Sequence, residues 1–182
     1  MKNPGKKFEE VFKKSINKDK HLLLRIPDPP QSFIKSEYSK FSNENPCDFV
    51  LFDTETKLMC LLELKTTKYK SMNFQIDKDD KQQKMIKYHQ INSLTNYSHY
   101  DGVVTGFVFN FRDEDKKLER TYFQNVVDFN NMISSIDKKS FNEMDLLLNK
   151  AIKIQGDKKR VNYKWDIDGL LHNIVKEGMK HE

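Results

Sequence analysis

The sequence is poor in the features that mark secreted, zinc-stapled and membrane-inserted proteins. Its two cysteines, Cys47 and Cys60, lie in no CxxC spacing and have no histidine cluster beside them. Neither a disulfide scaffold nor a structural zinc site is therefore indicated. The longest unbroken apolar run, residues 58–62, is far shorter than the roughly 18 residues that a membrane span requires. Because no apolar signal region follows the lysine-rich N-terminus either, we expect a cytoplasmic protein without membrane contact.

The chain also lacks internal repeats, Gly/Ser- or Pro-rich linkers and low-complexity blocks, so nothing divides it into units. Its length of 182 residues fits a single domain over residues 1–182. Thirteen Phe, seven Tyr and one Trp supply enough large apolar side chains for a core, which argues against global disorder. The net charge of +5 is compatible with a nucleic-acid partner but does not demand one.

The spacing of apolar residues predicts a mixture of helices and strands. In a first helix, which follows Gly5, Phe8, Val11, Phe12 and Ile16 share one face. Strands are predicted over 22–26, 48–53, 58–64, 102–112 and 118–124, with hairpin turns at 54–57 and 113–117. Helices are predicted over 80–97, 126–136, 141–149 and 167–175, and segments 152–155 and 162–165 flank a turn. This order indicates an α/β or α+β fold with a mixed central sheet flanked by helices.

The most informative stretch is Asn45-Pro46-Cys47-Asp48, followed fifteen residues later by Glu63-Leu64-Lys65. If the hairpin closes symmetrically, Asp48 lies opposite Glu63, about 5 Å away, and Lys65 projects from the same face. Two carboxylates held this close need a cation, and Mg²⁺ prefers carboxylate oxygens. The alternative is that Lys65 alone balances their charge, because such a pattern arises often in a highly charged chain.

Two predicted helices can bring further polar groups to this site. Glu9 lies at the edge of the apolar stripe of the first helix, whereas Glu10 projects away from it. On the predicted 80–97 helix, Gln90 falls within an arc formed by Ile86, Leu94 and Tyr97, so its amide needs a partner. Gln90 could bond a metal water or a phosphate near the site, or it could be a satisfied core or helix-capping residue.

Hydroxyl and basic residues follow the motif directly. Such groups suit contacts with phosphates, and they are Thr66, Thr67, Lys68 and Lys70. Other basic positions that could contact DNA are Lys6, Lys7, Arg25, Lys35, Lys40 and the turn at 157–160. For each of these other positions, a solvated surface charge is the alternative interpretation.

We expect residues 30–45 to form a short stalk-like loop between the first strand and the motif strand. Phe33, Tyr38 and Phe41 offer rings that could stack on unpaired bases, and Lys35 and Lys40 offer phosphate contacts. In the alternative interpretation these rings pack on the core.

The Pro-x-Asp and Glu-x-Lys hairpin behind an acidic helix resembles the PD-(D/E)xK nuclease superfamily. Within it, the chain is similar to the RecU Holliday junction resolvases over most of its length. The matching segments are Phe8-Glu9, Arg25-Ile26-Pro27-Asp28-Pro29, Glu63-Leu64-Lys65-Thr66-Thr67-Lys68, Phe74, His89-Gln90, Gly102-Val103, Phe107 and Tyr163.

This resemblance implies a restriction-endonuclease-like core and a Mg²⁺-dependent, homodimeric endonuclease that cuts four-way DNA junctions, as in recombination and repair. Mn²⁺ could substitute for Mg²⁺. It also implies that Asp48, Glu63, Glu9 and the Leu64 carbonyl hold the metal, while Lys65 positions or deprotonates the attacking water. The lysine- and asparagine-rich composition suits a phage or bacterial version, acting in the bacterial cytoplasm.

The same resemblance assigns Gln90 to the catalytic site and phosphate contacts to Thr67 and Lys68. Two departures from the RecU pattern are a short span at 30–45, where RecU proteins have a long stalk, and Cys47 in place of a hydroxyl residue. Junction binding is therefore expected to differ. The alternatives are a restriction- or repair-type endonuclease on duplex DNA and a non-catalytic DNA-binding protein.

Overall fold

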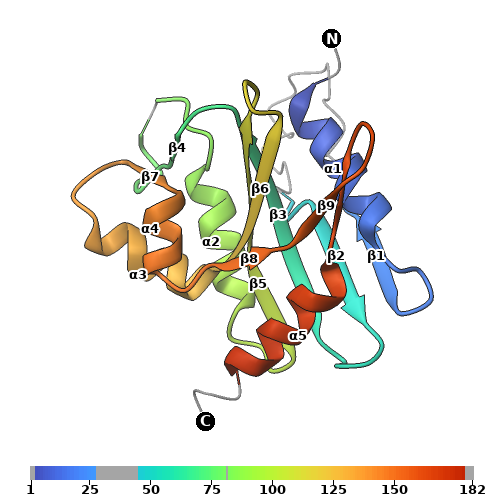
Figure 1. The fold of residues 1–182 in the computed structure, drawn as a ribbon. Coiled ribbons are helices and arrows are strands. Elements are labelled where there is room, and N and C mark those ends of the chain that lie inside the picture. Colours follow the sequence, from blue (N-terminus) through green and yellow to red (C-terminus); the bar gives the residue numbers. More distant parts are fainter. Residues whose placement is uncertain (1–2, 28–44, 81, 179–182) are drawn as a thin grey trace, which may run out of the picture.

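A six-stranded sheet forms the centre of the computed structural model, which describes residues 3–27, 45–80 and 82–178 (Figure 1). Its strands are β1 (His21–Arg25), β2 (Phe49–Asp53), β3 (Met59–Thr67), β5 (Val103–Asp113), β6 (Leu118–Asn125) and β8 (Ile152–Ile154). They are ordered β1-β2-β3-β5-β6-β8 across the sheet. β3 and β5 run parallel, and the other neighbours in this sheet run antiparallel. The predicted mixed central sheet is confirmed.

Helices cover both faces of this sheet (Figure 1). They are α1 (Pro4–Ser15), α2 (Tyr88–Tyr97), α3 (Val126–Ser135), α4 (Glu143–Leu148) and α5 (Ile167–Gly178). α1 and α5 pack on one face, where Phe8, Phe12 and Leu170 belong to a first buried cluster. α2, α3 and α4 pack on the other face, where Leu94 and Phe129 belong to a second cluster. The helices predicted at both ends of the chain are confirmed.

β5 separates the two clusters and is buried on both faces. Val108 points into the first cluster, whereas Phe107, Phe109 and Phe111 point into the second. This explains why the strand is an almost continuous apolar run, as expected for a strand covered on both sides. β3 runs beside it as far as the pair Thr67 and Phe111, so β3 extends beyond the predicted end at residue 64.

Two small sheets complete the fold. β4 (Ser71–Asn73) pairs with β7 (Ser140–Asn142), and β9 (Gly156–Lys158) pairs with β10 (Tyr163–Trp165). The sequence placed a turn at 156–159, where most of the span is strand β9, and the turn between β9 and β10 falls at 159–162. It predicted neither β4 nor β7. The helix predicted from residue 141 begins only at Glu143, because Phe141 belongs to β7 and pairs with Met72 of β4. Asn142 then caps α4 by accepting hydrogen bonds from the backbone N–H groups of Met144 and Asp145.

The helix predicted over 80–97 is wrong in its first half, because α2 begins only at Tyr88. A helix over these residues would use their backbone N–H groups in its own hydrogen bonds, but a distant side chain binds one of them. Asn73 Oδ1 accepts the Met85 N–H at 2.7 Å. Ile86 is buried through a bridge with Phe74 rather than on a helix face. The apolar face of α2 therefore carries Ile91 and Leu94, and the side chain of Tyr97 is 41% exposed.

The proposed stalk-like loop, including Lys35 and Lys40, lies outside the described residues up to position 44. Its described ends lie beside the motif strand: the Ile26 N–H donates to the Asp48 carbonyl at 2.9 Å, and Asn45 Nδ2 donates to the Pro27 carbonyl at 2.7 Å. Within the part of the chain that the structure describes, no helix has the length and apolarity to cross a bilayer.

Candidate active site

Asp48 and Glu63 face each other at the open end of the β2–β3 hairpin. Phe49 pairs with Leu62 in the register that the sequence predicted. The Asp48 N–H donates to the Leu62 carbonyl at 3.1 Å, and Asp48 Oδ2 accepts the Leu64 N–H at 2.8 Å. The predicted juxtaposition of the two carboxylates is confirmed, and the backbone of β3 fixes the orientation of Asp48.

Lys65 and Gln90 both bind the same oxygen of Glu63. Lys65 Nζ lies 2.7 Å from Glu63 Oε1, and Gln90 Nε2 donates a second hydrogen bond to that atom. Gln90 Oε1 in turn accepts the Lys87 N–H at 3.0 Å, which caps α2. The two interpretations of Gln90 therefore hold together: the side chain caps its helix and also contacts the carboxylate site.

The two carboxyl groups of the site both have raised pKa values. Burial raises the pKa of Glu63 to about 7; Lys65 opposes this rise and the Asp48 carboxylate adds to it. Burial also raises the pKa of Asp48, although the Leu64 N–H and Lys65 favour its ionised form. Two acids whose charged forms are disfavoured by burial and by each other are stabilised by a nearby positive charge.

Glu9 reaches this site from α1 as an ion pair with Arg25. Arg25 Nε donates to Glu9 Oε2 at 3.0 Å. Both charges act on Asp48, since Glu9 raises its pKa and Arg25 lowers it. The Glu9 side chain is 21% exposed, whereas Glu10 is exposed, so the predicted helical phase is confirmed. Arg25, which the sequence offers as a DNA contact, pairs with a carboxylate beside Asp48.

The candidate metal donors are two carboxylates and one carbonyl. Among the described residues, no three His, Cys, Asp or Glu side chains lie close enough to form a metal site by themselves. The structure thus does not bring Glu9 together with Asp48 and Glu63 as a three-carboxylate group. In an extended strand the N–H and C=O of one residue point to the same side. Because the Leu64 N–H donates to Asp48, the Leu64 carbonyl also points toward that carboxylate.

The hydroxyl and basic residues after the motif are split between the two faces of the sheet. Thr66 Oγ1 donates to Asn110 Oδ1 at 2.7 Å on the α1 face, away from the carboxylates. Thr67 is 3% exposed and its Oγ1 accepts the Tyr69 N–H, so the expected phosphate contact of Thr67 is wrong for this conformation. Lys68 and Lys70 are exposed just beyond the end of β3 and remain available to DNA.

Lys6 and Lys7 lie exposed on the first turn of α1, as a phosphate contact requires. Gln75 is a supporting residue that sequence reasoning missed, and the structure also defines the place of Cys47. Gln75 Oε1 accepts the Tyr88 N–H at the start of α2 and so helps to place Gln90. Cys47 is 2% exposed and burial raises the pKa of its thiol to about 12, so it is a neutral core residue beneath the site. No local spacing in the sequence predicts the contact of Gln75 with α2.

Comparison with known proteins gives a curated relative and similar solved structures. No protein-family model matches the chain. The SPbeta prophage-derived uncharacterized protein YotM of Bacillus subtilis (strain 168) is 28% identical over 186 residues, which cover 96% of this chain and 88% of that protein. Hjc, a Holliday junction resolvase from Archaeoglobus fulgidus, has a similar structure with a TM-score of 0.45 and 12% identity, covering 81% of this chain and 91% of Hjc.

Proposed function

We propose that the chain is a metal-dependent DNA endonuclease with a restriction-endonuclease-like core. The observation that carries this proposal is the convergence of Asp48, Glu63 and Lys65 on one face of a strand hairpin. This arrangement supports a site that would hold a divalent cation and an ammonium beside a phosphodiester. The basic side chains of Lys68 and Lys70 lie just past the same strand end, where a DNA backbone would leave the site.

The donor set fits Mg²⁺, with Mn²⁺ as a substitute. Mg²⁺ is commonly held by one or two carboxylates and completes its shell with waters and substrate phosphates. Asp48 and Glu63 supply two carboxylates, and the Leu64 carbonyl points to the same place. No hydrogen bond from the described residues engages Asp48 Oδ1 or Glu63 Oε2, which leaves one oxygen of each carboxylate for a cation. When bound, the ion would act as a Lewis acid toward the scissile phosphate.

The side chains around the carboxylates would orient the reaction. Lys65 Nζ, anchored on Glu63 Oε1, is positioned to orient or deprotonate the attacking water and to balance negative charge that develops on the phosphoryl oxygens. Gln90 holds the same Glu63 oxygen and so fixes the direction of the carboxylate. The ion pair between Glu9 of α1 and Arg25 would place one negative and one positive charge beside Asp48. Each of these side chains already contacts its neighbouring residue in the protein.

For the substrate, we propose four-way DNA junctions cut by a homodimer. This proposal is supported by the sequence resemblance to RecU resolvases, which runs from Phe8-Glu9 to Tyr163 in the expected order. The prophage origin of the relative YotM fits a phage protein acting in a bacterial cytoplasm. Symmetric cleavage of a junction needs two sites, and a dimer of this chain would supply them.

An assay with separate four-way, forked and linear duplex DNAs tests the function. In Mg²⁺ or Mn²⁺ we expect cleavage of the four-way junction in preference to both other substrates, and no cleavage in EDTA. Equal cleavage of the linear duplex would instead indicate a restriction- or repair-type enzyme. DNA binding without cleavage in either metal would indicate a non-catalytic DNA-binding protein.

Replacing Glu9 tests the contribution of α1. We expect Glu9→Gln to lower cleavage roughly 10- to 100-fold, because groups that orient metal ligands typically contribute that much. The neighbouring Glu10→Gln serves as the control; it removes the same charge from an exposed position, where a substitution usually changes stability by about 0.5 kcal/mol or less. Initial rates at saturating Mg²⁺ give the comparison. Equal losses in the two variants would show that Glu9 acts only through net charge.

A further inference from the structure

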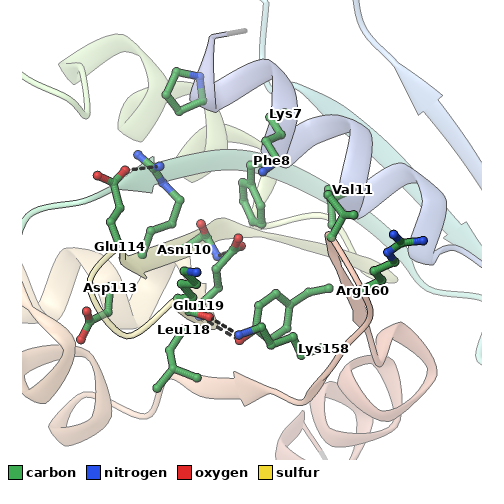
Figure 2. Close-up of a pocket in the computed structure, with 15 residues that line it drawn as sticks. Lys7, Phe8, Val11, Asn110, Asp113, Glu114, Leu118, Glu119, Lys158 and Arg160 are labelled. Atoms are coloured by element: carbon green, nitrogen blue, oxygen red, sulfur yellow. Dashed lines mark hydrogen bonds and ion pairs between the residues drawn. The ribbon is translucent and has the colours of Figure 1, made fainter. Parts of the chain in front are cut away.

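A pocket of about 360 Å³ lies on the α1 face of the sheet, behind the strand that carries the carboxylate site (Figure 2). Consecutive residues of a strand point to opposite faces: Lys65 contacts Glu63, and Thr66 contacts Asn110 in the wall of this pocket. Three elements surround the cavity, namely the first turns of α1, the tip of the β5–β6 hairpin and the β9–β10 hairpin. The carboxyl end of β3 therefore carries the carboxylate site on one face and contacts a wall residue of the pocket on the other.

The rim of the pocket concentrates positive charge that the protein does not neutralise. Lys7, Lys117, Lys158 and Arg160 line it, and none of the four forms an ion pair within the described part of the chain. Lys158 Nζ donates to the Lys117 carbonyl at 2.7 Å, which holds the two hairpins together. Like charges gathered around one concave surface raise the local concentration of anions.

The acidic side chains of the pocket have partners other than the four rim cations. Glu114 Oε1 lies 2.9 Å from Arg112 Nη1, and Asp113 Oδ2 lies 3.9 Å from Lys116 Nζ. Glu119 Oε2 accepts a hydrogen bond from Asn110 Nδ2. Within the described residues, these carboxylates thus form no ion pair with Lys158 or Arg160, which leaves both cations available to a ligand.

The floor of the pocket is apolar and partly aromatic. Phe8 and Val11 reach it from α1, and Leu118 reaches it from the β5–β6 hairpin. The Tyr163 ring also lines it and is held in place by stacking on Trp165, with 4.9 Å between ring centroids and 7° between planes. A fixed apolar floor under a cationic rim suits a planar base with an attached phosphate, because aromatic and apolar surfaces accept the faces of bases.

We propose that this pocket binds one nucleotide unit of the DNA strand, with its base on the floor and its phosphate against Lys158 and Arg160. This inference rests on the proposed function and extends it by assigning a DNA contact outside the carboxylate site. The volume lies at the lower end of the range for small-molecule sites, which matches a single nucleotide better than a duplex. The pocket would hold DNA on the α1 side of β3 while the scissile phosphate occupies the other side.

The test compares two double variants of the same hairpin. Lys158→Ala with Arg160→Ala removes the two rim cations. Lys159→Ala with Lys164→Ala removes the same net charge from side chains that do not line the pocket: Lys159 pairs with Asp157, and Lys164 lines a separate surface depression. Fluorescence anisotropy measures binding of a labelled four-way junction in EDTA over a salt titration, and thermal melting checks that each variant is folded.

We expect the rim variant to bind about tenfold or more weakly at 0.15 M salt, with a salt slope shallower by roughly one unit, because the single phosphate contact that it loses contributes about 0.9 to that slope. The control should stay within about threefold of the parent, with an unchanged slope. Equal effects of the two double variants would overturn the proposal. A parent protein that binds DNA and cuts it while the rim variant binds equally well would overturn only the pocket, whereas a parent that fails to bind DNA would overturn the proposed function as well.

Discussion

Replacing Asp48 by Asn or Glu63 by Gln is expected to reduce metal-dependent DNA cleavage by at least ~10²–10³-fold, the loss typical of removing one preorganised charge-stabilising group. Each substitution keeps the shape of the side chain but removes a negative donor that the cation needs. DNA binding in EDTA should stay near the parental affinity, since phosphate contacts come from basic residues elsewhere. Initial cleavage rates and anisotropy titrations separate the two effects.

The control for this pair is Glu55→Gln on the same hairpin. The Glu55 side chain is 64% exposed and pairs with Lys20 at the turn, so the variant removes a carboxylate without touching the site. Cleavage close to the parental rate in both Asp48→Asn and Glu63→Gln would place the active site elsewhere. A matching loss in Glu55→Gln would show that net charge, rather than position, determines activity.

The dependence of stability on pH gives a readout of Glu63 that does not require activity. The pKa of Glu63 is raised to about 7 in the folded protein, above its ordinary value of 4.5. The stability contributed by its protonated form is therefore fully present below pH 4.5 and is lost as the pH rises through about 7. Glu63→Gln cannot ionise, so in EDTA the melting temperature of the parent should fall relative to that of the variant between pH 5 and pH 8. An unchanged difference across that range would contradict the buried position of Glu63.

The carboxylate pair was predictable because its geometry is local. A tight hairpin between two apolar runs permits few registers, and the symmetric one places Asp48 opposite Glu63 whatever surrounds it. Period two then places Lys65 on the same face. The helical phase of Glu9 followed from the apolar stripe of α1 in the same way. These inferences need only chain geometry, and the structure confirms them.

The contacts that the sequence did not reveal are long-range. The sequence correctly placed Gln90 at the site. It did not predict that α2 starts at Tyr88, where Gln75, thirteen residues earlier, accepts the N–H of the first helical residue. Thr67 is buried because β3 continues beside β5, where its partner Phe111 lies 44 residues further along the chain. Arg25 meets Glu9 only once β1 and α1 have packed together. The periodicity of the sequence does not predict such contacts, since each contact depends on where another helix or strand ends.

Removing the ammonium of Lys65 distinguishes chemistry from charge balance. The Lys65 side chain is 17% exposed and contacts Glu63 Oε1 at 2.7 Å, so Lys65→Met keeps the apolar stem while it removes the charge. We expect cleavage to fall about 10²–10³-fold at saturating Mg²⁺, because the ammonium would stabilise charge that develops only in the transition state.

If Lys65 instead only balances the charge of the two carboxylates, the Lys65→Met variant would depend more strongly on the bound cation. Activity at saturating Mg²⁺ would then stay near the parental level, within about threefold. Lys68→Met is the matched control, because Lys68 is exposed three residues further along and does not reach Glu63. It should change DNA affinity and leave the cleavage rate at saturating DNA unaltered. Rates measured across a Mg²⁺ titration for both variants therefore decide whether the third residue of the Glu-Leu-Lys motif acts on the reacting phosphate or only on its carboxylate neighbours.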